Sequence, residues 1–451
     1  MDLRPRIADL LPRARSELAE LVAFRSVADP ARFPPGECHR AARWVRDKFL
    51  ELGFADARLV DTSDGSRAVL GSRGRAGPDA PTVLLYAHYD VQPPLSETAW
   101  QTPPFRLTEV GGRWYGRGAA DCKGNILMHL TALRALDSAV PDLPVNLKLV
   151  VEGSEEQGTG GLENFVAGNA ELLRADAMLI CDTGNAAVGV PAATVSLRGM
   201  VTLTVTVETL ATAVHSGIYG GAAPDALAAL VSTLATLRDD RGDTTVSGLA
   251  NTQRWTGEPY PAERFRGDAG VLDDVDLLGD GTVADMLWAR PAVTILGIDC
   301  PPARGAASAI TPHAAARLNL RVPPGTDAAD ARTALIRHLH AAAPWNARVT
   351  VRTHATGAPF LASVTGRAHR ALATAMREAY GRPMTTLGQG GSIPLCTALA
   401  ETCPDAELLL IGVEDPRAAI HAPNESVDPR ELATMALAEA LFLRHYATGA
   451  H

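Results

Sequence analysis

Apolar and polar residues follow helical and strand-like patterns in turn over most of the chain. Apolar positions three and four residues apart predict helices at 5–24, 38–52, 124–137, 160–175, 363–380 and 429–447. Continuous apolar runs predict strands buried on both faces at 81–87, 145–151, 177–181 and 408–413. Because these helices and strands alternate, the pattern predicts a doubly wound α/β sheet.

A different pattern begins near residue 197. Residues 201–207 read Val-Thr-Leu-Thr-Val-Thr-Val, the strict alternation of a strand with one face in solvent. Further strands and helices of an α+β unit are predicted at 224–238, 292–298, 315–322, 327–341 and 347–353. Strands of the first kind resume afterwards. We therefore expect a discontinuous domain formed by residues 1–196 and 361–451, with a second domain inserted at 197–360.

Composition and charge narrow the class of protein. The 451 residues are 46% hydrophobic and 21% charged, which is typical of a globular protein. The net charge of -9 argues against nucleic acid or an anionic membrane as a partner. The N-terminus lacks the apolar core of a signal peptide, and no run reaches the roughly 18 apolar residues that span a bilayer. The six cysteines form no Cys-x-x-Cys pair, so we expect a cytoplasmic protein that acts on a small molecule.

Imidazole and carboxylate side chains follow the predicted strands. They are His88-Tyr89-Asp90, Asp121, Glu155-Glu156, Asp182 and His421. Taken singly, each has a common structural explanation, such as a packed histidine or a solvated turn. Because ligand sites lie at the carboxyl ends of parallel strands, we expect these side chains to converge. Mixed imidazole and carboxylate ligation suits zinc, manganese or cobalt better than calcium or magnesium.

The set is large enough for two cations. Two metal ions about 3.5 to 4 Å apart need a bridging carboxylate, further ligands on each side and a base for the shared water. Of the adjacent Glu155 and Glu156, one can bind metal while the other takes the proton. Asp90 is placed to hold the imidazole tautomer of His88, with a cap or turn aspartate as the alternative. A dinucleotide fingerprint is rejected because Asp121 stands where its third glycine belongs.

Together these clusters resemble the M20 metallopeptidases, and within them the dipeptidases that include carnosinases and cysteinylglycine dipeptidases. The matching segments run in family order at 88–93, 100–105, 116–124, 152–158, 197–199, 215–217, 288–291, 390–394 and 421–425. The resemblance implies that His88 and Asp182 bind one metal ion and that Glu156 and His421 bind the other. It further implies that Asp121 bridges the two ions, with Glu155 as the general base. The inserted domain is then a lid used for homodimerisation.

The resemblance also assigns residues outside the metal ligands. His215 matches a histidine that reaches the partner subunit's active site and stabilises the oxyanion, with a surface histidine as the alternative. Arg321 matches the arginine that holds the substrate's terminal carboxylate, with an exposed strand arginine as the alternative. Gly391 and Ser392 are expected to contact substrate. Cys122 stands where the family usually has aspartate, after a peptide that is commonly cis. Of two interpretations, a residue that tunes the metal preference and a small apolar filler, we favour the filler.

Two departures from the family concern the substrate. Gln389 stands where many relatives have glutamate, which removes an anchor for a substrate amine, and Ser308 begins a changed segment nearby. We expect a two-metal hydrolase, with zinc first and manganese or cobalt as alternatives, that cleaves the amide bond of a small substrate such as a dipeptide. One alternative is an amidase or deacylase for an N-acyl amino acid or specialised metabolite. A non-catalytic binding protein on the same fold is the alternative from another class.

Overall fold

The computed structural model describes residues 2–74, 76–77 and 79–449, and the chain divides into two compact units. Unit 1 comprises residues 1–195, 362–387 and 394–451, and unit 2 comprises 196–361 and 388–393. Residues 388–393 were expected in the second segment of the larger domain, but they group with unit 2. The reason is close packing: a Cβ on Gly388 would lie 2.5 Å from the Trp288 side chain, and one on Gly390 would lie 2.9 Å from Arg198 Nη2.

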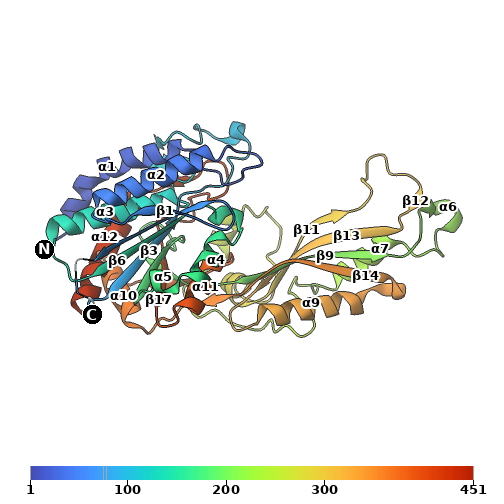
Figure 1. Ribbon diagram of the computed structural model, residues 1–451. Helices are drawn as coiled ribbons and strands as arrows, with labels where there is room; N and C mark the ends of the chain where they lie inside the picture. The colour runs from blue at the N-terminus through green and yellow to red at the C-terminus, as the bar shows by residue number, and fades with distance from the viewer. Residues whose placement is uncertain (1, 75, 78, 450–451) are drawn as a thin grey trace. The chain divides into compact units, whose positions relative to one another are not determined.

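A mixed sheet forms the centre of unit 1 (Figure 1). Its strands run in the order β1-β2-β6-β3-β7-β17-β8, and β16 also pairs with β8. The short strand β15, whose residues belong to unit 2, pairs with Ser196 and Leu197 at the end of β8. The four strands β6, β3, β7 and β17 are parallel, whereas β1, β2 and β8 pair antiparallel. The bounds are β1 (Arg58–Asp61), β2 (Arg67–Gly74), β3 (Thr82–His88), β6 (Asn146–Glu152), β7 (Ala177–Cys181), β8 (Ala192–Leu197), β15 (Phe360–Leu361), β16 (Thr385–Gln389) and β17 (Glu407–Ile411).

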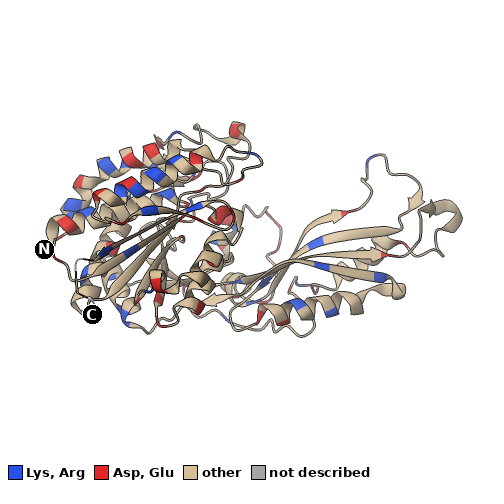
Figure 2. Ribbon diagram, in the orientation of Figure 1, with Lys and Arg blue, Asp and Glu red and all other residues tan. Residues whose placement is uncertain are grey.

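Helices pack on this sheet, and the apolar faces of α1, α2, α3, α10 and α12 share one core with the buried strands. The bounds are α1 (Arg4–Ala23), α2 (Gly36–Glu51), α3 (Lys123–Ala139), α4 (Gly161–Gly168), α5 (Ala170–Leu173), α10 (Arg367–Tyr380), α11 (Pro394–Thr402) and α12 (Pro429–Thr448). Helix α12 packs on α3 and α10, and α4 packs on α11. Acidic and basic residues are mixed along α1 and α2 (Figure 2). No helix in the described residues is long and apolar enough to cross a membrane.

A small sheet joins two distant parts of unit 1. Its strands β4 (Thr108–Val110), β5 (Arg113–Tyr115) and β18 (Ser426–Val427) run in the order β18-β5-β4. The pairing of β5 with β18 places Trp114 opposite Val427. The segments that follow β5 and precede β18 are thereby brought together.

Unit 2 is built on a four-stranded antiparallel sheet in the order β11-β13-β9-β14. Its larger elements are β9 (Gly199–Glu208), α7 (Ala226–Ala235), α8 (Ala262–Ala269), β11 (Ala292–Asp299), β13 (His313–Val322), α9 (Ala328–Ala342) and β14 (Arg348–Gly357). In β9 the predicted alternation holds, because Val201, Val205 and Val207 are fully buried in a core with α7 and α9. Short elements are β10 (Val214–His215), α6 (Ser216–Tyr219), β12 (Ala309–Ile310) and a π-helical turn at Asp285–Ala289.

Candidate metal centre

Five predicted side chains meet beyond the carboxyl ends of the parallel strands in unit 1. His88 is the last residue of β3, and Asp182 directly follows the neighbouring β7. Asp121 precedes α3, and Glu156 lies in a short 3-10 turn (Glu155–Gln157) after β6. His421 comes from the loop between β17 and β18. Parallel strands end at the same edge of a sheet, which is why residues far apart in sequence converge here.

The interatomic distances sort these side chains into two groups that share Asp121. His88 Nε2 lies 3.0 Å from Asp121 Oδ1 and 3.1 Å from Asp182 Oδ1. His421 Nε2 lies 2.9 Å from Asp121 Oδ2 and 3.0 Å from Glu156 Oε2. Asp121 therefore presents one carboxylate oxygen to each imidazole, which is the arrangement of a bridging ligand in a two-metal site.

The chemistry of this donor set fits divalent cations. Imidazole nitrogens and carboxylate oxygens are ligands of zinc and its neighbours in the first transition series. Glu155 stands beside the group, and burial, followed by the charge of Asp182, raises the pKa of Glu155 well above its usual value. Hydrogen bonds to Asp121 and Glu156 raise the pKa of His421 to about 11. Carboxylates gathered in this number need nearby positive charge to stay ionised.

Asp90 contacts both His88 and the Glu155–Gln157 turn. His88 Nδ1 makes its hydrogen bond to the backbone carbonyl oxygen of Asp90, at 3.1 Å, whereas the nearest carboxylate oxygen of Asp90 is 3.4 Å away. The carboxylate instead accepts the backbone N–H groups of Glu155 at 3.2 Å and of Glu156 at 3.1 Å. The main chain of Asp90 orients the imidazole, and its side chain holds the Glu155–Gln157 turn.

Gln92 and Glu425 hold the remaining parts of the centre. Gln92 donates its backbone N–H to Glu156 Oε1 at 3.1 Å and its amide to Oε2 at 2.9 Å. Glu425 is fully buried and accepts Arg117 Nη1 at 2.7 Å. Its other hydrogen bonds come from the backbone N–H groups of Gly118, Ala120 and Asp121. One carboxylate thus fixes the loop that carries the bridging residue.

The His421 loop has an unusual backbone. Ala419, His421 and Asn424 have φ values of 53°, 61° and 68°, in the left-handed region that non-glycine residues rarely adopt. Asn424 Oδ1 accepts the backbone N–H of Gln101 at 2.7 Å, and its amide donates to the Ala99 carbonyl at 3.2 Å. These contacts support the strained turn that presents His421 to Asp121.

Comparison with known proteins identifies the family. Residues 84–445 match the family model described as peptidase family M20/M25/M40. The chain belongs to this family. The predicted family and enzyme class, a metallopeptidase, are confirmed.

Relatives of this M20 peptidase match it over nearly its full length. A cysteinylglycine-S-conjugate dipeptidase of Corynebacterium striatum is 45% identical over 441 residues, covering 96% of this chain and 95% of the relative. The structure of human carnosine dipeptidase 1 matches with a TM-score of 0.82 at 26% identity, covering 99% of this chain and 98% of that one. The structure of the dipeptidase Dug1p from Saccharomyces cerevisiae has a TM-score of 0.81 at 23% identity over 100% of this chain and 98% of that one. The predicted fold class is confirmed.

The predicted residues of the M20 lid lie in unit 2. His215 caps α6, where its Nδ1 accepts the backbone N–H of Gly217 at 3.0 Å, and its side chain is exposed. Arg321 lies in β13 opposite Met200, and burial lowers the pKa of its guanidinium. Gly391 and Ser392 belong to the 388–393 segment. Because these residues are outside unit 1, their roles at the metal centre stay predictions.

Two further side chains lie beside the predicted ligands: Glu414, to which sequence reasoning gave no role, and Cys122, for which it favoured a filler role. Carboxylate oxygens of Glu414, Asp121 and Asp182 all lie within 4.8 Å of one another. The signal for Glu414 was present, since it follows the apolar run 408–413, but it matched no expected ligand. Ligand atoms of His88, Cys122 and Asp182 form a second such group within 4.8 Å, which the interpretation of Cys122 as a filler did not anticipate. The peptide between Asp121 and Cys122 is cis.

Proposed function

We propose that this M20 peptidase is a two-metal hydrolase that cleaves dipeptides. The observation that carries the proposal is the position of Asp121 between His88 and His421, with one oxygen 3.0 Å and the other 2.9 Å from an imidazole nitrogen. The names of the relatives, which describe dipeptidases, support a dipeptide as the substrate.

The proposed ligands follow the two groups. His88 and Asp182 hold one ion, His421 and Glu156 hold the other, and Asp121 bridges them. Zinc is our first assignment and manganese or cobalt the alternatives, because the donors are imidazole and carboxylate. When bound, such a pair of ions polarises the scissile carbonyl and lowers the pKa of water at the site.

Glu155 acts as the general base in this proposal. It takes the proton of the attacking water and delivers it to the leaving amine. Its raised pKa suits this task, because a base works best when its pKa lies near the working pH. The Asp90 carboxylate positions Glu155 by accepting its backbone N–H at 3.2 Å.

Unit 2 supplies substrate recognition in this proposal. Arg321 pairs with the terminal carboxylate of the dipeptide, which is supported by the lack of any carboxylate partner for Arg321 in the described part of the chain. His215 stabilises the oxyanion, and Gly391 and Ser392 contact the substrate. Because the His215 side chain is exposed, it is available to stabilise the oxyanion in the active site of a second subunit.

The lid is the proposed dimer interface. Strand β11 is an edge of the unit 2 sheet and carries the exposed apolar side chains Ile295, Leu296 and Ile298. An edge strand with this composition is a surface for pairing with another chain. We therefore propose a homodimer.

Turnover of a dipeptide library by the metal-loaded protein tests the proposal. Glu155→Gln should lower kcat by at least the roughly 10²-fold that a general base contributes, with metal content unchanged. Glu171→Gln, at an exposed position on α5, is the matched control and should retain activity. Retained kcat in Glu155→Gln would overturn the assignment of the base.

The same library separates the alternatives. Each dipeptide is compared with its N-acetylated form. A preference for the acetylated form would favour the amidase alternative, which Gln389 motivates. Metal-loaded protein that turns over neither class would favour the binding-protein alternative.

A further inference from the structure

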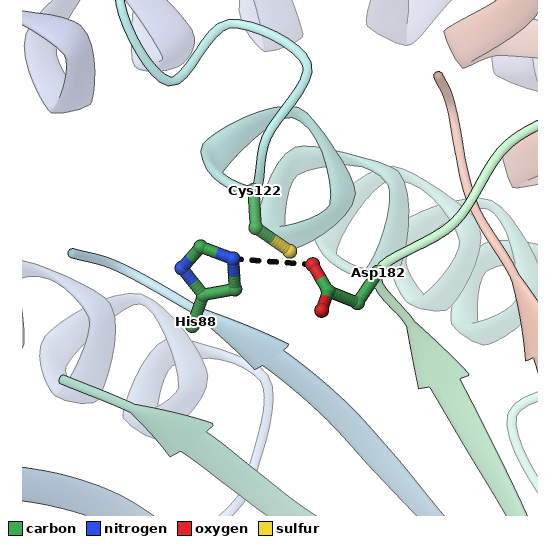
Figure 3. Close-up of side chains that lie close together, drawn as sticks. All are labelled: His88, Cys122 and Asp182. Atoms are coloured by element: carbon green, nitrogen blue, oxygen red, sulfur yellow. Dashed lines mark hydrogen bonds and ion pairs between the residues drawn. The ribbon is translucent and has the colours of Figure 1, made fainter. Parts of the chain in front are cut away.

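Cys122 has polar neighbours that a filler side chain does not need. It is fully buried at the residue that precedes α3. Figure 3 shows its sulfur directed toward the space between the His88 imidazole and the Asp182 carboxylate. Their ligand atoms all lie within 4.8 Å of one another, and His88 Nε2 is 3.1 Å from Asp182 Oδ1. Three potential metal ligands therefore face one point.

The spacing of these atoms suits a single ion. Zinc binds sulfur at about 2.3 Å and imidazole nitrogen at about 2.0 to 2.1 Å. A tetrahedral arrangement with those bond lengths separates neighbouring ligand atoms by roughly 3.4 to 3.6 Å. The ligand atoms of the group lie within 4.8 Å of one another, so they are close enough to be drawn onto one ion.

One of the two hydrogen bonds at the sulfur favours a ligand. Asn125 Nδ2 donates to Cys122 Sγ at 3.4 Å. The Asn125 amide is oriented for this contact, because its Oδ1 accepts the backbone N–H of Val413 at 2.9 Å. The thiol donates to the Cys181 carbonyl at 2.9 Å, a hydrogen bond that is lost when the proton leaves. A buried N–H donor aimed at sulfur stabilises a thiolate and orients it as a ligand, as outer-shell partners do in metal sites.

We propose that Cys122 is a thiolate ligand of the ion that His88 and Asp182 hold. This inference rests on the proposed two-metal function and deepens it. On binding, the S–H bond breaks, a metal–sulfur bond forms, and the proton passes to solvent. The two halves of the centre then differ in chemistry: the half with His88 includes a soft sulfur donor, and the half with His421 has imidazole and carboxylate donors. Soft thiolate ligands select zinc or cobalt over manganese and magnesium, so the half with Cys122 discriminates among metals.

Cobalt(II) absorption tests the ligand directly. Metal-free full-length protein is titrated with Co²⁺, and the sulfur-to-cobalt charge-transfer band is recorded together with the number of ions bound per chain. The wild-type protein should develop the band, and Cys122→Ser should lack it while still binding cobalt. Cys403→Ser is the matched control, because Cys403 is a buried cysteine whose charged neighbours, Lys148, Arg174 and Glu171, are not metal ligands. It should keep the band.

Two further measurements keep the outcome decisive. Cys122→Asp places the usual family residue at this position, so a folded variant without the band is available if Cys122→Ser is unstable. In competition between Zn²⁺ and Mn²⁺, both variants should prefer zinc less than the wild-type protein does. We expect the ratio of zinc affinity to manganese affinity to fall by at least roughly 10-fold, which is the cost of losing a supporting partner in a metal site.

The results separate this inference from the proposed function. Two bound ions with no charge-transfer band, or a band that persists in both Cys122 variants, would overturn the thiolate assignment and leave the two-metal hydrolase intact. Failure of the wild-type protein to bind cobalt, zinc or manganese would overturn both.

Discussion

Replacing Asp90 with asparagine removes one oxygen from a carboxylate that accepts two backbone N–H groups. In the structure, Oδ1 accepts from Glu155 at 3.2 Å and Oδ2 from Glu156 at 3.1 Å, and Asp90 is fully buried. Asparagine keeps one acceptor and turns an NH₂ group toward the other N–H. The hydrogen bond of His88 Nδ1 is to the Asp90 backbone carbonyl, so the substitution leaves it in place.

The expected magnitude follows from the lost contact. A hydrogen bond to a charged group contributes about 1.5 to 3 kcal/mol, so the free energy of unfolding should fall by about 2 kcal/mol. The larger effect is on catalysis, because the turn that carries the base loses its anchor. Misplacing a catalytic group by about 1 Å costs on the order of 10²-fold in rate, and we expect kcat to fall by that factor.

The assay combines kcat on the best dipeptide of the library with metal content after dialysis against metal-containing buffer. Asp90→Asn should bind the same number of ions as the wild-type protein while kcat falls. Asp47→Asn, at an exposed position on α2, is the control for the chemical change. If Asp90→Asn instead loses an ion and its fully loaded form retains wild-type kcat, the carboxylate acts through the imidazole, and our reasoning about the turn is wrong.

Two further predictions concern buried ion pairs. Glu425→Gln leaves the guanidinium of Arg117 buried without its carboxylate. The free energy of unfolding, measured by urea denaturation, should therefore fall by about 3 to 5 kcal/mol. A variant as stable as the wild-type protein would refute the role of Glu425. The second pair is His129 with Glu439, 2.9 Å apart and fully buried. Burial lowers the pKa of His129, but the charge and hydrogen bond of Glu439 and the hydrogen bond to the Tyr86 carbonyl together raise it more, so the net pKa is raised. The stabilisation that the His129–Glu439 pair gives the folded protein is therefore fully present below about pH 6.5, the pKa of histidine in the unfolded chain. It is lost as the pH rises through the pKa of His129 in the folded protein. Glu439→Gln should destabilise the protein more at about pH 6 than at about pH 9 in denaturation experiments, and an equal loss at both would contradict this coupling.

The central strands could be predicted because a strand buried on both faces is a continuous run of apolar residues. The run predicted at 81–87 is β3, and the run at 177–181 is β7, so the apolar pattern alone was enough to place His88 and Asp182 at strand ends. Local breaks were harder to see. The helix expected at 160–175 is divided into α4 and α5, and Asn169 at the break donates its side-chain amide to the Phe165 carbonyl at 2.8 Å.

Contacts between distant segments had no signal in the sequence. Arg117 and Glu425 are 308 residues apart, and they meet only because β5 and β18 pair. Periodicity describes which face of an element is buried, but it does not tell which other segment covers it. For the same reason the sequence left two partners open for the Asp90 carboxylate, the His88 imidazole and a cap or turn. In the structure the carboxylate accepts two backbone N–H groups of the turn after β6.

The two halves of the centre differ in burial, and the topology explains why. His88 and Asp182 follow central parallel strands, and 0% and 8% of their side chains are exposed. In the other half, His421 lies on a loop after the sheet and 54% of its side chain is exposed, whereas the Glu156 side chain is 2% exposed. Charges interact more strongly where water is excluded, so the ion that we propose for His88 and Asp182 would lie in a region of lower dielectric constant. Asp121 belongs to both halves, and Glu425 fixes the loop that carries it. This loop therefore couples the buried half to the half in which His421 faces solvent, where a substrate can approach.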